Sequence, residues 1–216
     1  MAWRELAERV EAEVRQATVE EQVVFCAGVA GRLMAQHEAL APGQRRPFTL
    51  ERRPLLDAVW DAACGDKSAF TRVKLGLAAY YVSGYCHNDG QDGPEDADDH
   101  AAAAVIHAAE CYLHGLADFA GLVSQRGCDA ADLRAQNAAA DHAGDATAFV
   151  DSDPQILAEL ERQLADLRLI RRFGAQLHNG RWGLPDETVE LLRRDLRGPL
   201  SRVQDPRGQG QGSVVR

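Results

Sequence analysis

Apolar residues along this chain recur every three or four positions, which is the spacing of one face of an α-helix. The clearest stretch begins at Ser152-Asp153-Pro154 and carries five apolar residues on one stripe: Leu157, Leu160, Leu164, Leu167 and Ile170. No window sustains the two-residue alternation of apolar and polar side chains that a half-buried strand requires. Aromatic residues make up only 6% of the sequence, so the core must be built from Leu, Val and many Ala. We therefore predict an all-α fold.

Start and stop signals divide the chain into about seven or eight helices. Thr18 and Glu21 form a capping-box pattern that begins a helix ending at Pro42-Gly43, and Pro54 fits the first turn of a later helix. Gly28 costs its helix about 1 kcal/mol relative to Ala, so we expect it to admit a neighbouring helix. Further segments with a helical pattern are 3–17, 68–86, 100–115, 116–126, roughly 130–149, 152–180 and a last helix from Pro185.

A chain of 216 residues is long enough for one large domain and too short for two comfortable ones. We predict a single compact helical domain over residues 1–203. No repeat of 30–50 residues is visible, which argues against a solenoid. The low-complexity segment 204–216 is rich in Gly and Gln, and we predict a disordered tail there.

The net charge of −9 disfavours nucleic acid and anionic membrane surfaces as partners, and it suits a basic partner. No apolar run is long enough to span a membrane, and the first residues lack the pattern of a signal peptide. The five cysteines are scattered and form no C-x-x-C pair. These features predict a reduced, cytoplasmic protein.

An alanine-rich helix that follows an acidic loop carries three histidines, seven residues apart. His100, His107 and His114 fall within a sector of about 40°, and Glu110 lies beside His114. The spacing of His107, Glu110 and His114 could bring three ligands to one divalent transition metal, with His100 or His142 completing the shell. A helical-bundle metalloenzyme or metal-binding protein is therefore one hypothesis.

The same geometry favours a simpler interpretation of the histidines. The apolar residues of this helix point in nearly the opposite direction, namely Val105, Ala109, Tyr112, Leu113 and Leu116. We therefore expect the histidine stripe to face solvent or a second protein surface. A third hypothesis is a small-molecule pocket lined by aromatic residues, namely Trp60, Tyr80, Tyr81 and Tyr85.

Four stretches of the chain resemble the YjaG-like family, bacterial proteins of unknown function. They are residues 23–34, residues 54–63, the acidic entry and alanine-rich helix over 94–115, and residues 153–167 with Glu159 and Gln163 in an E-x-x-x-Q pattern. The resemblance implies a compact all-helical domain. It carries no established activity, and no catalytic residue follows from it.

No nucleophile elbow, P-loop or dinucleotide fingerprint is present, so no motif indicates an enzyme. We expect a cytoplasmic helical protein that binds a protein partner, or a second copy of itself, without a cofactor. Regulatory, adaptor and toxin-neutralising roles all fit this expectation. The metal site at His107, Glu110 and His114 is the alternative.

Overall fold

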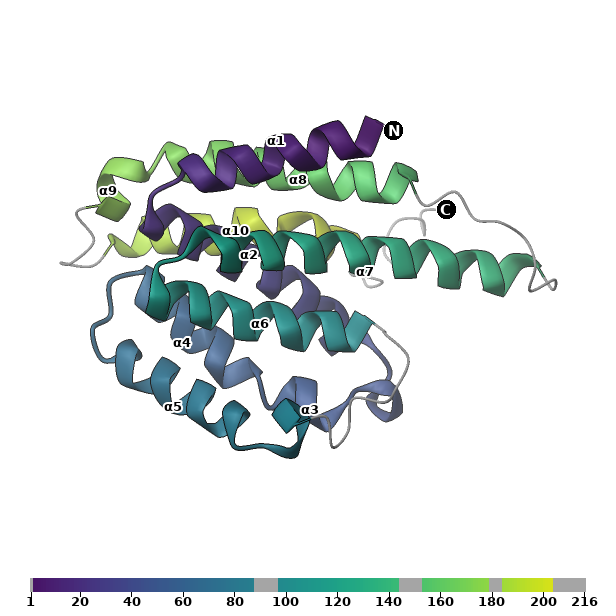
Figure 1. The fold of residues 1–216 in the computed structure, drawn as a ribbon, viewed down its shortest axis with the longest axis horizontal. Coiled ribbons are helices and arrows are strands. Elements are labelled where there is room, and N and C mark those ends of the chain that lie inside the picture. Colours follow the sequence, from purple (N-terminus) through teal and green to yellow (C-terminus); the bar gives the residue numbers. More distant parts are fainter. Residues whose placement is uncertain (1, 88–96, 144–152, 179–183, 204–216) are drawn as a thin grey trace, which may run out of the picture.

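The computed structural model describes residues 2–87, 97–143, 153–178 and 184–203 (Figure 1). All regular structure in these ranges is helical, which confirms the all-α prediction. The eight longer helices of the described ranges agree with the expected seven or eight, and α3 and α9 are single turns. The elements are α1 (Ala2–Gln16), α2 (Val19–Ala39), η1 (Pro42–Gln44), α3 (Pro47–Leu50), α4 (Arg53–Ala63), α5 (Ala69–Tyr81), η2 (Gly84–His87), α6 (Ala97–His114), α7 (Ala117–Ala143), α8 (Asp153–Arg171), α9 (Gly174–His178) and α10 (Asp186–Val203). The predicted tail, 204–216, lies outside the described residues.

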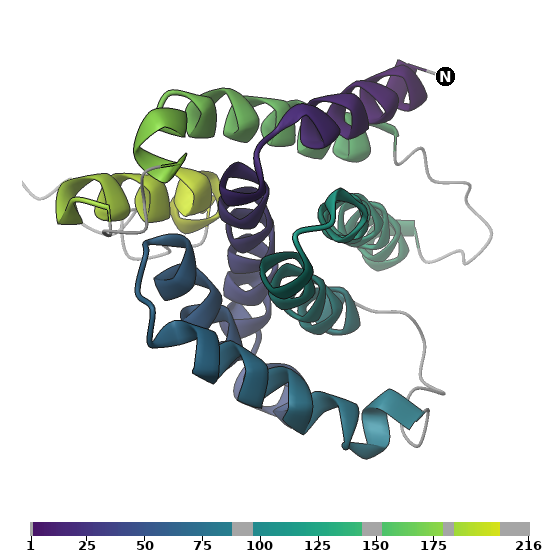
Figure 2. The ribbon, with the colours of Figure 1, turned by 60° about the vertical axis from the view of Figure 1, so that its left-hand side comes forward.

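Helix α2 is the centre of the fold, and every residue from 21 to 34 is buried. Figure 2 shows other helices around it on all sides, with α1 and α8 above it, α10 and α4 on one flank, and α6 and α7 on the other. A helix that is buried on every face must be enclosed in this way. Helix α5 lies at the outer edge of the molecule, on the side away from α1 and α8 (Figures 1 and 2).

Local chemistry places the starts of α2 and α4 where the sequence predicts them, whereas α2 ends at Ala39, before the predicted Pro42-Gly43. The backbone N–H of Thr18 donates to Glu21 Oε2 at 2.9 Å, and the N–H of Glu21 donates to Thr18 Oγ1 at 3.3 Å. This is the reciprocal pattern of a capping box. Pro54 lies in the first turn of α4. A Cβ added at Gly28 would lie 3.2 Å from Leu196 of α10, so this glycine does admit a neighbouring helix.

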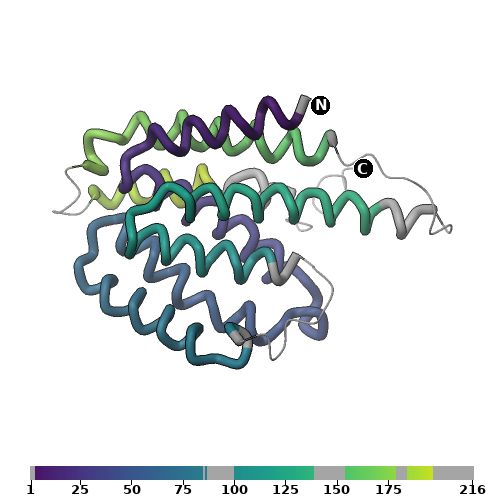
Figure 3. Tube along the Cα trace, in the orientation of Figure 1, coloured from purple at the N-terminus to yellow at the C-terminus, as the bar shows by residue number. Residues whose placement is uncertain are grey.

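Helix α7 differs from the prediction, which divided this region into segments 116–126 and 130–149. One uninterrupted helix runs from Ala117 to Ala143 (Figure 3). Gly127, which separates the two sequence patterns, is helical and lies against α8. The change of pattern therefore marks a change of neighbours along one helix. Conversely, the predicted helix 152–180 is divided, since α8 ends at Arg171 and a short turn precedes α9.

Candidate functional site

The histidines of α6 do not share one solvent face. His100 is buried, with 3% of its surface exposed, so the expected solvent position is wrong for this residue. The His107 side chain retains 24% exposure, and only His114 is exposed. The physical reason is the alanine body of α6, which lets α2 and α7 approach the helix from different sides. Leu116, which was assigned to the apolar face, is instead 53% exposed beyond the end of the helix.

His107 and Glu110 are brought together by α6, as their spacing predicts. His107 Nδ1 lies 2.8 Å from Glu110 Oε2, and the hydroxyl of Tyr81 donates to Glu110 Oε1 at 2.6 Å. Burial acts to raise the pKa of Glu110, but the hydrogen bonds from His107 and Tyr81 outweigh it and lower that pKa. Burial and the hydrogen bond to the same carboxylate raise the pKa of Tyr81 to about 12.

The third predicted ligand, His114, packs against Phe119 of α7 with ring centroids 5.6 Å apart. Phe119 also stacks with His107 at 6.4 Å. Within the described residues, no group of three His, Cys, Asp or Glu side chains is arranged to hold a metal ion. The side chain of His142 lies outside the described part of α7. Both oxygens of Glu110 are thus occupied by protein hydrogen bonds rather than directed at a shared ligand position.

The described aromatic residues of the third hypothesis lie on α4 and α5. Trp60 is a core residue with 2% exposure, and the Arg193 guanidinium lies 5.7 Å from its ring. Tyr80 and Tyr81 lie on α5 with ring centroids 5.5 Å apart. The side chain of Tyr85 lies outside the described residues. The pocket of the third hypothesis therefore stays a prediction, since one of its four residues lies outside the described side chains.

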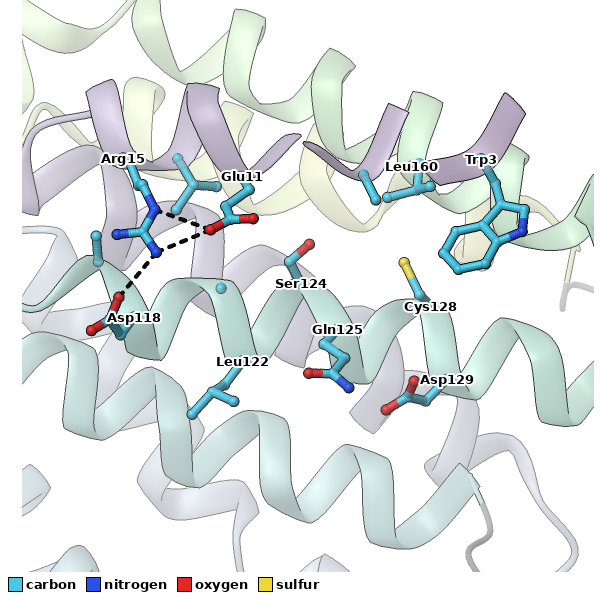
Figure 4. A pocket seen from close by; sticks show the side chains of 14 residues that line it. Trp3, Glu11, Arg15, Asp118, Leu122, Ser124, Gln125, Cys128, Asp129 and Leu160 are labelled. Carbon is cyan, nitrogen blue, oxygen red and sulfur yellow. Dashed lines mark hydrogen bonds and ion pairs between the residues drawn. The ribbon is translucent and has the colours of Figure 1, made fainter. Parts of the chain in front are cut away.

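An open groove of about 600 Å³ lies between α1 and α7 (Figure 4). Helices α1 and α7 both pack on α8, and Leu160 of α8 contributes to the groove between them. We call this feature the α1/α7 groove. Its lining residues are Trp3, Ala7, Glu11, Val14, Arg15, Ala117, Asp118, Gly121, Leu122, Ser124, Gln125, Cys128, Asp129 and Leu160.

The α1/α7 groove has two chemically different ends (Figure 4). At one end Arg15 lies 3.0 Å from Glu11 and 3.4 Å from Asp118, so its charge is shared between two carboxylates. At the other end the Trp3 ring lies near Cys128. The antiparallel course of α1 and α7 produces this arrangement, because the start of α1 meets the middle of α7.

The charged residues of the α1/α7 groove are mostly acidic. Three carboxylates line the groove, those of Glu11, Asp118 and Asp129, beside one guanidinium, that of Arg15. Arg126, which is not a lining residue, pairs with Asp129 at 3.3 Å. Leu122 is 36% exposed and adds an accessible apolar contact between the two ends. The groove therefore combines an apolar strip with an excess of one negative charge, since two guanidiniums offset three carboxylates.

A buried polar network fixes the wall behind the groove. The Ser124 hydroxyl donates to Gln163 Oε1 at 2.5 Å, and Gln163 Nε2 donates to Glu159 Oε1 at 3.0 Å. Arg32 of α2 completes the network by donating to Glu159 Oε1 at 3.1 Å and to Asp166 Oδ2 at 2.5 Å. Because these bonds connect α2, α7 and α8, they hold the helices at a fixed spacing.

The two groove residues with nucleophilic atoms are not activated. Burial, together with the charges of Glu159 and Asp129, raises the pKa of the Cys128 thiol to about 12. A thiol with this pKa is protonated near neutral pH and is a poor nucleophile. The Ser124 hydroxyl donates its proton to an amide oxygen, which is not a general base. Neither side chain therefore has the activation that a catalytic nucleophile requires.

The sequence alone did not single out the groove residues. Trp3 is an aromatic residue near the start of the amphipathic segment 3–17, and it carries the clearest local signal. Adjacent apolar residues at Leu122 and Val123 also indicate that α7 uses two faces, of which Val123 is buried and Leu122 accessible. No local feature of the sequence indicates which helices meet at the groove.

No helix in the described ranges is sufficiently long and apolar to cross a membrane. Comparison with protein-family models, curated proteins and solved structures gives no match to this chain. The resemblance to the YjaG-like family therefore stays a prediction.

Proposed function

We propose that the protein binds a partner protein through the α1/α7 groove, and that the bound element is a basic amphipathic helix of the partner. The observation that carries this proposal is the groove itself, which joins accessible apolar surface to an excess of carboxylates. A groove of this kind receives the apolar face of a helix, while basic side chains on the flanks of that helix meet the acidic rim.

The dimensions of the groove support a helical occupant. Trp3 and Arg15 lie at opposite ends of the groove and are separated by twelve residues of α1, a span of about 18 Å. A partner helix of roughly twelve residues has the same length and presents apolar side chains at i, i+3, i+4 and i+7. A contact with one helix of this length buries a small area, which is typical of a transient regulatory or adaptor interaction.

We also propose that the protein acts in the cytoplasm of a bacterium. All five cysteines are free, which agrees with a reducing environment. The bacterial origin depends on the family resemblance.

Selection from a display library of helical peptides tests the proposal. The library contains basic amphipathic peptides and acidic peptides that have the same apolar pattern. We expect the protein to enrich the basic set. The substitution Leu122→Glu should reduce binding of an enriched peptide by about tenfold or more, since it places a charge on the apolar strip. Asp118→Lys should weaken the same peptide and increase recovery of acidic ones.

Leu50→Glu is the matched control for Leu122→Glu. Leu50 of α3 is 38% exposed, close to the 36% of Leu122, but does not line the groove. We expect this variant to bind as the wild type does. Equal enrichment of acidic and basic peptides, or equal loss of binding in Leu50→Glu and Leu122→Glu, would contradict the proposal. Preferential binding of small hydrophobic cations in place of peptides would also overturn it.

A further inference from the structure

Helix α5 carries an apolar stripe that no other described element covers. Its inner face holds the buried Val73 and Leu77. On the opposite face lie Leu75, which is 65% exposed, and Val82 just beyond the helix, which is 82% exposed. Exposure of this degree for two large aliphatic side chains on one helix is a common sign of an interface.

The stripe has the spacing of a helix-packing seam. Thr71, Leu75, Ala78 and Val82 follow one another at intervals of four, three and four residues, which is the alternation of the core positions of a coiled coil. All four are exposed, and no charged residue interrupts the stripe. The face is therefore suited to pairing with one further helix rather than to contact with solvent.

We infer that α5 is a self-association surface, at which two copies of the chain pair through antiparallel α5 helices about a twofold axis. An antiparallel arrangement centred between Leu75 and Ala78 sets Leu75 of each copy on Ala78 of the other. It also sets Val82 on Thr71. Each larger side chain then meets a smaller one, and the surface is complementary to itself, as a twofold interface requires.

Charge selects the antiparallel direction. Lys74 flanks the seam towards the start of α5, and Tyr81 lies on the same flank near its end, with its hydroxyl on the Glu110 carboxylate. Antiparallel pairing places Lys74 of one copy beside the Tyr81 and Glu110 pair of the other. Parallel pairing would instead bring Lys74 to the opposite flank of the other copy, away from its Tyr81 and Glu110 pair.

The expected dimer is weak, and it leaves the groove free. Helix α5 has 13 residues and a length of about 20 Å, so one helix pair buries an area at the low end of stable interfaces. The α1/α7 groove lies on the other side of the molecule (Figures 1 and 2). A dimer would therefore present two grooves and bind a bivalent partner with increased avidity.

Sedimentation velocity over a wide range of protein concentration tests this inference. We expect a reversible monomer–dimer equilibrium in the wild type and about tenfold or greater weakening of the dimer in Leu75→Glu and Val82→Glu. Lys74→Glu should also weaken it, since the new carboxylate would lie beside Glu110 of the other copy. Circular dichroism should show native helicity in these variants, because the substituted side chains are exposed.

Leu122→Glu separates this inference from the proposed function. That variant should lose peptide binding and retain the dimer, whereas Leu75→Glu should retain peptide binding and lose the dimer. A wild-type protein that stays monomeric at all concentrations would overturn the inference, as would dimers that persist in both Leu75→Glu and Val82→Glu. Unchanged dimerisation in Lys74→Glu would overturn the antiparallel register.

Discussion

Gly127 of α7 lies so close to Gln163 of α8 that a Cβ at this position would be 2.9 Å from Gln163 Nε2. The same Cβ would be 2.9 Å from Glu159 Oε1 and 3.3 Å from Val29. Gln163 has no exposed surface, and its amide is hydrogen-bonded at both ends. A side chain at position 127 would therefore both separate α7 from α8 and displace Gln163 from its hydrogen bonds.

Gly127→Ala should therefore destabilise the protein by about 2 kcal/mol, because overpacking and lost hydrogen bonds outweigh the better helix propensity of Ala. Gly121→Ala on the same helix is the control, since a Cβ there meets nothing within 4 Å. That variant should be stabilised by about 0.5–1 kcal/mol. Chemical unfolding in urea measures both changes, and a loss of stability in Gly121→Ala similar to that in Gly127→Ala would refute the explanation.

Arg32→Met should cost about 3–5 kcal/mol of unfolding free energy, because it leaves Glu159 without its buried counter-charge and Asp166 with Arg162 alone. The Arg32 side chain is 4% exposed and also donates to the backbone oxygen of Leu196 at 2.9 Å. Arg15→Met, at an ion pair that is 57% exposed, should cost less than about 1 kcal/mol. Thermal and urea unfolding compare the two variants, and similar losses would count against a buried network.

Glu110 should contribute to the pH dependence of stability. Hydrogen bonds from His107 and Tyr81 lower its pKa in the folded protein despite its burial, relative to the ordinary value of 4.5. The stabilisation is therefore present above pH 4.5 and is lost as pH falls through the lower folded value. Wild-type protein should lose more stability than Glu110→Gln when acidified from pH 6 through this range. Identical acid dependence of the two proteins, measured by urea unfolding at several pH values, would show that the pair makes no such contribution.

Cys128 should resist alkylation although it lines the groove. With a pKa of about 12, only about one thiol in ten thousand is ionised at pH 8. Reaction with iodoacetamide should be slower than that of an unstructured peptide thiol by a factor of about a thousand. Mass spectrometry of the labelled protein over time measures the rate, with the urea-unfolded protein as the control. Equal rates in the folded and unfolded protein would be incompatible with the assigned environment.

Features decided by neighbouring residues in the sequence could be predicted. The capping box of Thr18 and Glu21, the position of Pro54 and the contact at Gly28 depend on short-range chemistry or on the lack of a side chain. The all-α fold follows from the apolar spacing. These features need no knowledge of which helices meet.

Features decided by tertiary neighbours could not be predicted. The helical wheel places His100 opposite the apolar residues of α6, yet it is buried, because an alanine helix can be enclosed on several faces. The continuity of α7 through Gly127 depends on the partner residues of α8. Likewise, the groove is formed by helices that are distant in sequence, so neither Trp3 nor Leu122 reveals it alone.

The contacts of Leu196 also bear on the order in which the chain can fold during synthesis. Gly28 and Arg32 of α2 are covered only when Leu196 of α10 arrives, more than 160 residues later. Until then, a nascent chain has a central helix with an uncovered face and an incompletely satisfied arginine. The native core can therefore close only at a late stage of translation, and an arrested chain lacking α10 is an expected substrate for chaperones.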